Sequence, residues 1–191
     1  MTTWFSSDYH HQHKNICQYT NRSLFTTPED HTEWLISLHN KQVKKDDQVF
    51  LIGDVSFATK FEDVAAFFRR LNGNITIIKG NHDDTKVLNY LVQSGDIHSW
   101  HDYKEIKLGG IPTVLFHFPI RSWHKQGYGA IHLAGHSHGS LPDVGGKFLD
   151  VGLDSVYNLF GEHRLLSEED VLEYMQNRPT KVEDHHKDRT V

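Results

Sequence analysis

Residues 131–139 read Ile-His-Leu-Ala-Gly-His-Ser-His-Gly, a short apolar run that leads into two histidines between glycines. The apolar part, Ile131–Ala134, has the composition of a strand and is bounded by glycine. Imidazoles at alternate positions, as in His136 and His138, are poorly suited to packing but well suited to binding metal ions. The segment therefore predicts a strand that ends in metal-binding side chains.

Four other short apolar runs also end in residues that metal ions prefer. Their ends are Ser7-Asp8-Tyr9-His10, Gly53-Asp54-Val55, Gly80-Asn81-His82-Asp83 and His117. Open α/β sheets place their ligands beyond the carboxyl ends of strands, so we expect these side chains to converge there. Two carboxylates, one amide oxygen and several imidazoles are enough to hold two divalent cations. The sequence thus predicts a two-metal site.

The remaining pattern alternates strands with helices and predicts an α/β fold. Strand-like runs cover Thr3–Ser6, Gln48–Ile52, Ile75–Lys79, Thr113–Phe116, Ile131–Ala134 and Lys147–Val151. Helices are expected after the cap residue Thr27, over Phe61–Asn72, over Thr85–Ser94, and after the cap residue Ser167. This order indicates a layered α/β protein with a mixed sheet. We expect a single domain over residues 1–179 and a polar, mobile tail over residues 180–191.

Composition narrows the class of protein. The chain has 191 residues, of which 37% are apolar, and a net charge of −5, which is compatible with a globular domain. Binding of extended nucleic acid is disfavoured because no basic stripe is present. No apolar run approaches the roughly 18 residues of a membrane span. Cys17 is the single cysteine, and an inert thiol is more common than a reactive one. Because no intramolecular disulfide is possible, the reducing cytoplasm is the expected location.

The order of the five motifs resembles that of the calcineurin-like metallophosphoesterase superfamily. The resemblance extends from Trp4 to Asp154 and is strongest to compact phage and bacterial phosphoesterases. It includes three further motifs, His13-Lys14-Asn15-Ile16, Asn21-Arg22-Ser23 and Val151-Gly152-Leu153-Asp154. Ser23 departs from the pattern, because those relatives commonly have proline there. The resemblance implies a layered α-β-β-α sandwich with mixed sheets and a dinuclear metal site at the C-terminal ends of the strands.

The resemblance also implies a role for each motif residue. Asp8, His10 and His138 look like ligands of one metal ion, Asn81, His117 and His136 look like ligands of the other, and Asp54 resembles the bridge between them. His82 would face the scissile phosphate, and Asp83 would orient the His82 ring. Arg22 is a candidate phosphate clamp, although a surface arginine is an equal alternative. Arg121 is expected to line the cleft.

Two divalent ions of Mn²⁺, Fe, Zn²⁺, Co²⁺ or Ni²⁺ would suit these mixed ligands. Two such ions against two carboxylates leave a charge of about +2, which favours a metal-bridging hydroxide and the binding of phosphate. The expected reaction is hydrolysis of a small phosphate ester, with diesters or nucleotides favoured and His82 as the group that assists the leaving oxygen.

Two other readings remain open. The first is a metal-binding interaction scaffold without turnover. The second is a zinc amidohydrolase, although in that group the His-x-His pair comes early in the chain. No motif indicates an oligomeric state.

Overall fold

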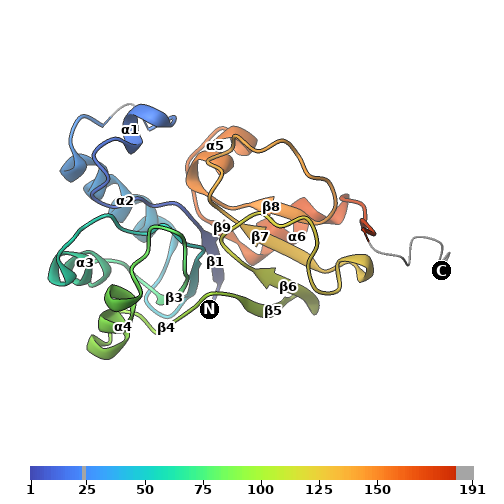
Figure 1. The fold of residues 1–191 in the computed structure, drawn as a ribbon, viewed down its shortest axis with the longest axis horizontal. Helices are drawn as coiled ribbons and strands as arrows, with labels where there is room; N and C mark the ends of the chain where they lie inside the picture. The colour runs from blue at the N-terminus through green and yellow to red at the C-terminus, as the bar shows by residue number, and fades with distance from the viewer. Residues whose placement is uncertain (23–24, 184–191) are drawn as a thin grey trace.

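Two β-sheets packed face to face form the centre of the molecule in the computed structural model, which describes residues 1–22 and 25–183 (Figure 1). The first sheet has the strand order β4 (Ser99–His101), β3 (Asn74–Ile78), β2 (Gln48–Leu51), β1 (Thr3–Ser6) and β9 (Leu166–Ser167). The second has the order β5 (Lys104–Leu108), β6 (Ile111–Leu115), β7 (Ile131–Ala134) and β8 (Phe148–Asp150).

Both sheets are mixed. Strands β1 to β4 are parallel, whereas β9 runs antiparallel to β1. In the second sheet β6, β7 and β8 are parallel, and β5 is antiparallel to β6. The predicted layered α/β sandwich with mixed sheets is therefore confirmed. Parallel neighbours end at the same edge of each sheet, which is what brings distant loops together.

The described helices are α1 (Ile16–Tyr19), α2 (Pro28–Gln42), α3 (Phe61–Phe68), α4 (Thr85–Ser94), α5 (Leu153–Phe160) and α6 (Glu168–Gln176), with a 3₁₀ turn at Gln126–Tyr128. Helices α2, α3 and α4 cover the outer face of the first sheet. Leu35 of α2, Phe67 of α3 and Leu91 of α4 pack on Val49 and Ile77 of the sheet in one buried cluster. Apolar burial of this kind stabilises the layer by about 25 cal/mol per Å².

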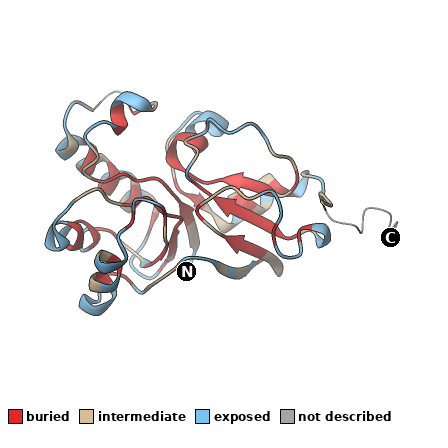
Figure 2. Ribbon diagram, viewed as in Figure 1, coloured by how far each residue is buried: buried red, intermediate tan, exposed pale blue. Residues whose placement is uncertain are grey.

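A second buried cluster lies between the two sheets. Phe50 of β2 and Ile78 of β3 pack against Leu115 of β6 and Leu133 of β7, and α5 and α6 close the cluster with Val156 and Met175. The interior strands, such as β7 and β8, are buried along their whole length, as Figure 2 shows, so their sequences are almost entirely apolar. This explains why the interior strands were predictable from composition.

Helix caps follow the predicted residues closely. Thr27 accepts a hydrogen bond from the Asp30 N–H at 3.1 Å with Pro28 in the first turn, and Ser167 forms a capping box with Asp170. Helix α4 ends at Gly95, whose φ of 77° is left-handed.

Several elements differ from the expectation or were not expected, among them helix α1 and strands β4 and β9. Helix α3 ends at Phe68, four residues before the predicted Asn72. Strand β5, Lys-Glu-Ile-Lys-Leu, alternates exposed and covered residues. It was not predicted because it contains three charged residues and is not an apolar run. Helix α5 directly follows the predicted strand end and was not expected.

The beginning of the predicted tail contacts the domain. Lys181 Nζ donates to the Val144 carbonyl at 2.9 Å, and Glu183 pairs with Arg121 at 3.2 Å. Residues 184–191 of the predicted tail, and Ser23 of the Asn21-Arg22-Ser23 motif, lie outside the described residues. The domain and tail boundaries stay a prediction. Among the described helices, none has the length and apolar character to span a membrane.

Candidate metal centre

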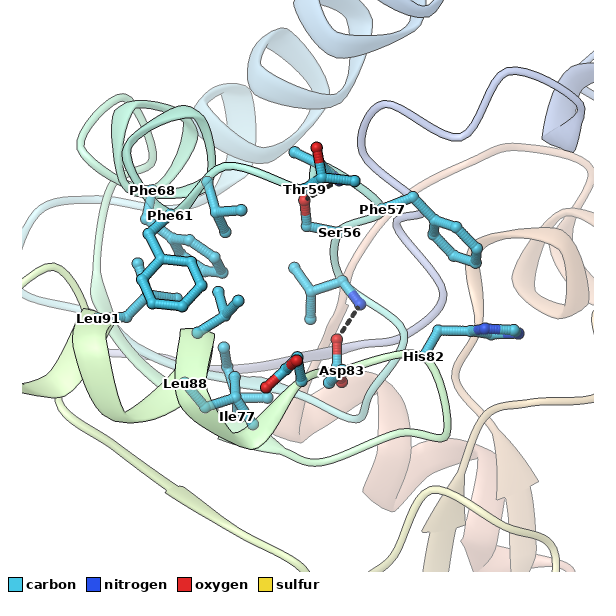
Figure 3. A pocket seen from close by; sticks show the side chains of 15 residues that line it. Ser56, Phe57, Thr59, Phe61, Phe68, Ile77, His82, Asp83, Leu88 and Leu91 are labelled. Atoms are coloured by element: carbon cyan, nitrogen blue, oxygen red, sulfur yellow. Dashed lines mark hydrogen bonds between the residues drawn. The ribbon is translucent and has the colours of Figure 1, made fainter.

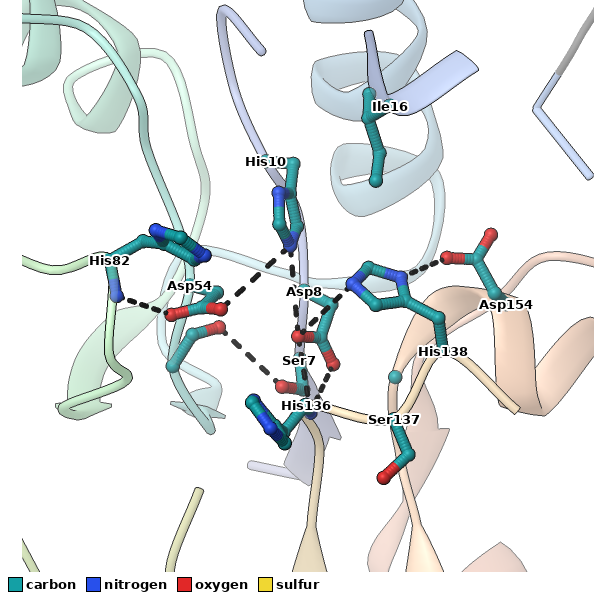
Figure 4. A network of polar contacts seen from close by, with 12 residues as sticks. Ser7, Asp8, His10, Ile16, Asp54, His82, His136, Ser137, His138 and Asp154 are labelled. Atoms are coloured by element: carbon teal, nitrogen blue, oxygen red, sulfur yellow. Dashed lines mark hydrogen bonds and ion pairs between the residues drawn. The ribbon is translucent and has the colours of Figure 1, made fainter. Parts of the chain in front are cut away.

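The loops after β1, β2, β3, β6 and β7 meet at one edge of the two sheets and bring the predicted ligands together. Figure 4 shows five of them, Asp8, His10, Asp54, His136 and His138. Five of these residues adopt a left-handed backbone that non-glycine residues rarely use, with φ of 56° at Asp8, 53° at His10, 53° at Asp54, 73° at His136 and 48° at His138. Each such conformation costs about 1–2 kcal/mol. Strain concentrated on the donor residues makes this edge the candidate functional site.

Two glycines allow the loops to approach closely. A Cβ on Gly80 would collide with the Asp54 side chain, and one on Gly135 would collide with the Ser7 side chain. The glycines that precede Asn81 and His136 are therefore required for packing, which is the reason for their place in the two motifs.

Asp8, His10 and His138 form the first donor group. One donor atom from each lies within 4.8 Å of the other two. His10 Nε2 is 3.8 Å from Asp8 Oδ1, and His138 Nε2 is 3.9 Å from the same oxygen. Within the described part of the chain, the buried His10 Nε2 has no hydrogen-bond partner. A buried imidazole nitrogen that faces carboxylates without a partner fits a metal ligand.

Asp54, His117 and His136 form the second donor group, and Asn81 joins it. Asn81 Oδ1 lies 3.2 Å from His117 Nε2 and 2.9 Å from His136 Nδ1. Asp54 Oδ2 is 3.4 Å from His117 Nε2 and 4.0 Å from His10 Nε2 of the first group. Asp54 thus stands between the two groups, where a bridging carboxylate would stand. The structure brings all seven predicted ligands together, while their role as ligands stays a prediction.

Burial and neighbouring charge shift the pKa values of several of these donors. Burial raises the pKa of Asp54, but the hydrogen bond and charge of His117 outweigh it and lower the pKa to about 2. Burial lowers the pKa of His117, and the Asp54 partner raises it above its ordinary value overall. Burial also lowers the pKa of His10. Asp54 is therefore ionised and His10 neutral at neutral pH, which are the states that ligate metals.

Asp154 orients one of the predicted ligands. Its carboxylate lies 2.7 Å from His138 Nδ1, so Nδ1 donates to Asp154 and Nε2 faces Asp8. This arrangement fixes the tautomer of His138 and leaves its Nε2 free to act as a ligand, as a carboxylate behind a metal-binding histidine does. Sequence reasoning noted Asp154 only as part of the Val151–Asp154 motif and gave it no role. The position of a carboxylate just beyond strand β8 was the available signal.

Arg22 corrects an expectation. Its side chain is fully buried, and it donates to Asp154 through Nε at 3.0 Å and Nη2 at 2.8 Å. It also donates to the carbonyls of Asp8 at 2.7 Å and Tyr9 at 3.1 Å. A guanidinium with these partners is unavailable to a phosphate. Arg22 holds the loop of the first donor group in place.

Asp83 also differs from its expected role. Its carboxylate accepts hydrogen bonds from the N–H groups of Gly80 at 2.8 Å, Asp54 at 2.9 Å and Val55 at 3.0 Å, and none of these bonds involves the ring of His82. Asp83 therefore ties the loop that carries Asn81 to the loop that carries Asp54, instead of orienting His82.

His82 lies at the border of the site. Its backbone N–H donates to Asp54 Oδ1 at 2.9 Å, and its exposed ring has its centroid 6.1 Å from that of His10. The ring belongs to neither donor group. This place, outside the ligands but beside them, is compatible with contact to a substrate.

Arg121 stands apart from both donor groups. Its side chain is 84% exposed and pairs with Glu183. Two neighbours of the first group were not expected. His13 Nδ1 is 3.0 Å from His10 Nδ1, and the Phe57 ring stacks on His13 with centroids 4.0 Å apart. The aromatic rings of His13 and Phe57 therefore lie beside the first donor group.

No protein-family model matches the chain. It is 30% identical to the uncharacterised protein MJ1445 of Methanocaldococcus jannaschii over 138 residues, covering 72% of this chain and 69% of that protein. It is 25% identical to the gene 66 protein of Mycobacterium phage L5, covering 80% of this chain and 86% of that protein.

One solved structure has the same fold along nearly its whole length. It is a protein of unknown function, AQ665 from Aquifex aeolicus, with a TM-score of 0.68 and 18% identity, covering 91% of this chain and 98% of that one. The chain therefore belongs to one family with the MJ1445 protein and shares its fold with AQ665, while the order of its donor motifs resembles that of the calcineurin-like metallophosphoesterase superfamily.

Proposed function

We propose that the chain is a dinuclear metal-dependent phosphoric ester hydrolase that prefers phosphodiesters. The observation that carries the proposal is the pair of donor groups that adjoin at Asp54, whose Oδ2 lies within 4.0 Å of an imidazole nitrogen from each. Imidazole, carboxylate and amide donors in this mixture suit Mn²⁺, Fe, Co²⁺, Ni²⁺ or Zn²⁺. Two such ions, when bound, supply Lewis acidity toward a phosphoryl group and activate water.

The chain's own residues supply the remaining chemistry. Asp8, His10 and His138 would hold one ion, and Asn81, His117 and His136 would hold the other. His82, exposed at the border of the centre, would donate a hydrogen bond or a proton to the leaving oxygen, a role worth 10²- to 10⁴-fold in typical enzymes. Asp154 keeps His138 Nε2 directed at Asp8, so it would position a ligand without contacting the substrate.

The charge of the site favours a diester over a monoester. A monoester carries a second negative charge and gains from a nearby arginine. Arg22 donates to protein acceptors, and Arg121 is exposed and pairs with Glu183. A singly charged diester is therefore the better match.

Turnover with a defined metal tests the proposal. The metal-free protein is loaded with Mn²⁺ and assayed on bis-p-nitrophenyl phosphate, p-nitrophenyl phosphate and cyclic nucleotides. We expect hydrolysis of the diester, little hydrolysis of the monoester, and loss of both in EDTA. Tight Mn²⁺ binding with no turnover of any ester would favour a non-catalytic metal-binding scaffold and refute the proposal.

A further inference from the structure

An apolar pocket of about 330 Å³ lies beside the metal centre, between α3, α4 and the loop of residues 55–59 (Figure 3). Its deepest wall consists of buried side chains, which include Val64, Phe68, Ile77, Leu88 and Leu91. Its mouth is more exposed, since Thr59 is exposed and Phe61 has 39% of its surface in contact with solvent. The pocket, which we name the α3–α4 pocket, is therefore open to solvent and apolar inside.

The α3–α4 pocket and the metal centre share an edge. Phe57 and His82 line the pocket at one side, opposite Phe61, Phe68 and Leu91 (Figure 3). The Phe57 ring lies 4.6 Å from the His82 ring and 4.9 Å from the His10 ring, measured between centroids. The pocket and the centre therefore adjoin at this pair of rings.

Charge in the α3–α4 pocket limits what can enter. The described residues that line it include two carboxylates, Asp83 and Asp84, and neither lysine nor arginine. Asp83 is engaged by three backbone donors and Asp84 by the Lys86 N–H at 2.6 Å, so neither side chain requires a cation. A second anionic group is therefore disfavoured, and an uncharged apolar group is favoured.

The volume of the α3–α4 pocket further limits the groups that it can bind. Small-molecule pockets commonly measure 300–1,000 Å³, and this one, at about 330 Å³, is near the lower limit. Such a volume accommodates one ring system and excludes a long chain or a second domain. The aromatic side chains Phe61 and Phe68 on its walls favour a flat ring over a branched aliphatic group.

We propose that the α3–α4 pocket binds the flat, uncharged ring of a phosphodiester substrate, an aryl group or a nucleobase. The inference rests on the proposed function, because it identifies the pocket as the subsite next to His82. The natural substrate class would then be diesters that carry a ring on the alcohol adjoining His82.

Binding to the metal-free protein tests the pocket without relying on catalysis. In EDTA, 1-naphthol, thymidine and cyclohexanol are titrated against the protein, with binding followed by calorimetry and by the methyl NMR signals of Leu88 and Leu91. We expect a saturable site in which the flat rings bind about tenfold tighter than cyclohexanol. The ratio between 1-naphthol and thymidine identifies whether the ring is aryl or a nucleobase.

A matched pair of variants locates the site. Val87→Trp fills the pocket from helix α4, whereas Val92→Trp places the same side chain on the same helix, at a position that is 38% exposed and outside the lining. We expect Val87→Trp to weaken 1-naphthol at least tenfold and Val92→Trp to leave it unchanged, with circular dichroism confirming that both variants fold. Equal effects of the two variants, or no saturable site, would overturn the inference.

Turnover then separates the two proposals. In the Mn²⁺-loaded protein, Val87→Trp should raise the KM of methyl 1-naphthyl phosphate about tenfold, whereas the exposed control Val92→Trp should leave that KM unchanged. Hydrolysis of diesters without any ring binding would overturn the inference and leave the proposed function standing. Ring binding that Val87→Trp abolishes, in a protein that hydrolyses no ester, would support the pocket and refute the proposed function.

Discussion

Replacing Asp83 with Asn alters a buried carboxylate that ties two ligand-bearing loops together. Asp83 Oδ2 accepts from the N–H groups of Asp54 and Gly80, and Oδ1 accepts from Val55. An asparagine oxygen can replace Oδ2, but its NH₂ group would then face the Val55 N–H and leave this donor unpaired. A buried donor without a partner costs about 1–3 kcal/mol, so Asp83→Asn should lower the free energy of unfolding by that amount.

Urea unfolding in EDTA, followed by circular dichroism, measures this loss without any contribution from metals. Asp84→Asn is the matched control, because Asp84 is exposed and caps α4 through the Lys86 N–H, and asparagine caps helices equally well. The control should differ from the parent by less than about 0.5 kcal/mol. If Asp83→Asn unfolds at the same urea concentration as the control, the loop-tying role of Asp83 is wrong.

His82→Ala should remove most turnover of an aryl diester while elemental analysis finds the metal content unchanged; near-native turnover would reject its catalytic role. Arg22→Met leaves the buried Asp154 carboxylate without its guanidinium and should destabilise the protein by about 3–5 kcal/mol in urea unfolding, and an unchanged midpoint would contradict this. Burial lowers the pKa of His39 and of His132 from 6.5 to about 4 in the folded protein, despite backbone hydrogen bonds that raise it. The unfolded chain therefore binds more protons below pH 6.5, so the free energy of unfolding should fall as the pH falls from 6.5 to 4, by up to about 3 kcal/mol for each histidine. His132→Phe should flatten this pH dependence, and an unaltered slope would show that His132 does not contribute.

The interior strands and the ligand set could be predicted because burial and chemistry constrain them tightly. Strands such as β7 are covered on both faces and must be continuously apolar, so Ile131–Ala134 was recognisable with its bounds. The glycines before Asn81 and His136 are required by close contacts with Asp54 and Ser7, so they appear in the motifs themselves.

Interactions between distant side chains could not be predicted in the same way. The family resemblance implied that Asp83 orients the His82 ring, but the Asp83 oxygens accept hydrogen bonds from the N–H groups of the Asp54 loop. Arg22 was a candidate phosphate clamp because the shape of a guanidinium matches phosphate oxygens. In the structure it instead donates to the buried Asp154 carboxylate, 132 residues away in the sequence. The sequence around Asp83 and around Arg22 does not indicate which distant groups these side chains contact.

The polar edge strands escaped prediction for a related reason. Strand β5 is partly exposed and half charged, and β9 contains two residues that pair with β1 through Trp4 and Phe5. Their formation depends on a neighbour that is already in place, so neither strand carries a strong signal in its own composition.

Counting metal ions tests most directly whether two donor groups share Asp54. The metal-free protein, Asp54→Ala and the exposed control Asp46→Ala are dialysed against Mn²⁺, and bound metal is measured by elemental analysis. The structure predicts two ions per chain for the parent and the control, and loss of both from Asp54→Ala, since Asp54 Oδ2 faces an imidazole of each group. A parent that binds a single ion, or an Asp54→Ala variant that retains the full pair, would contradict a shared centre.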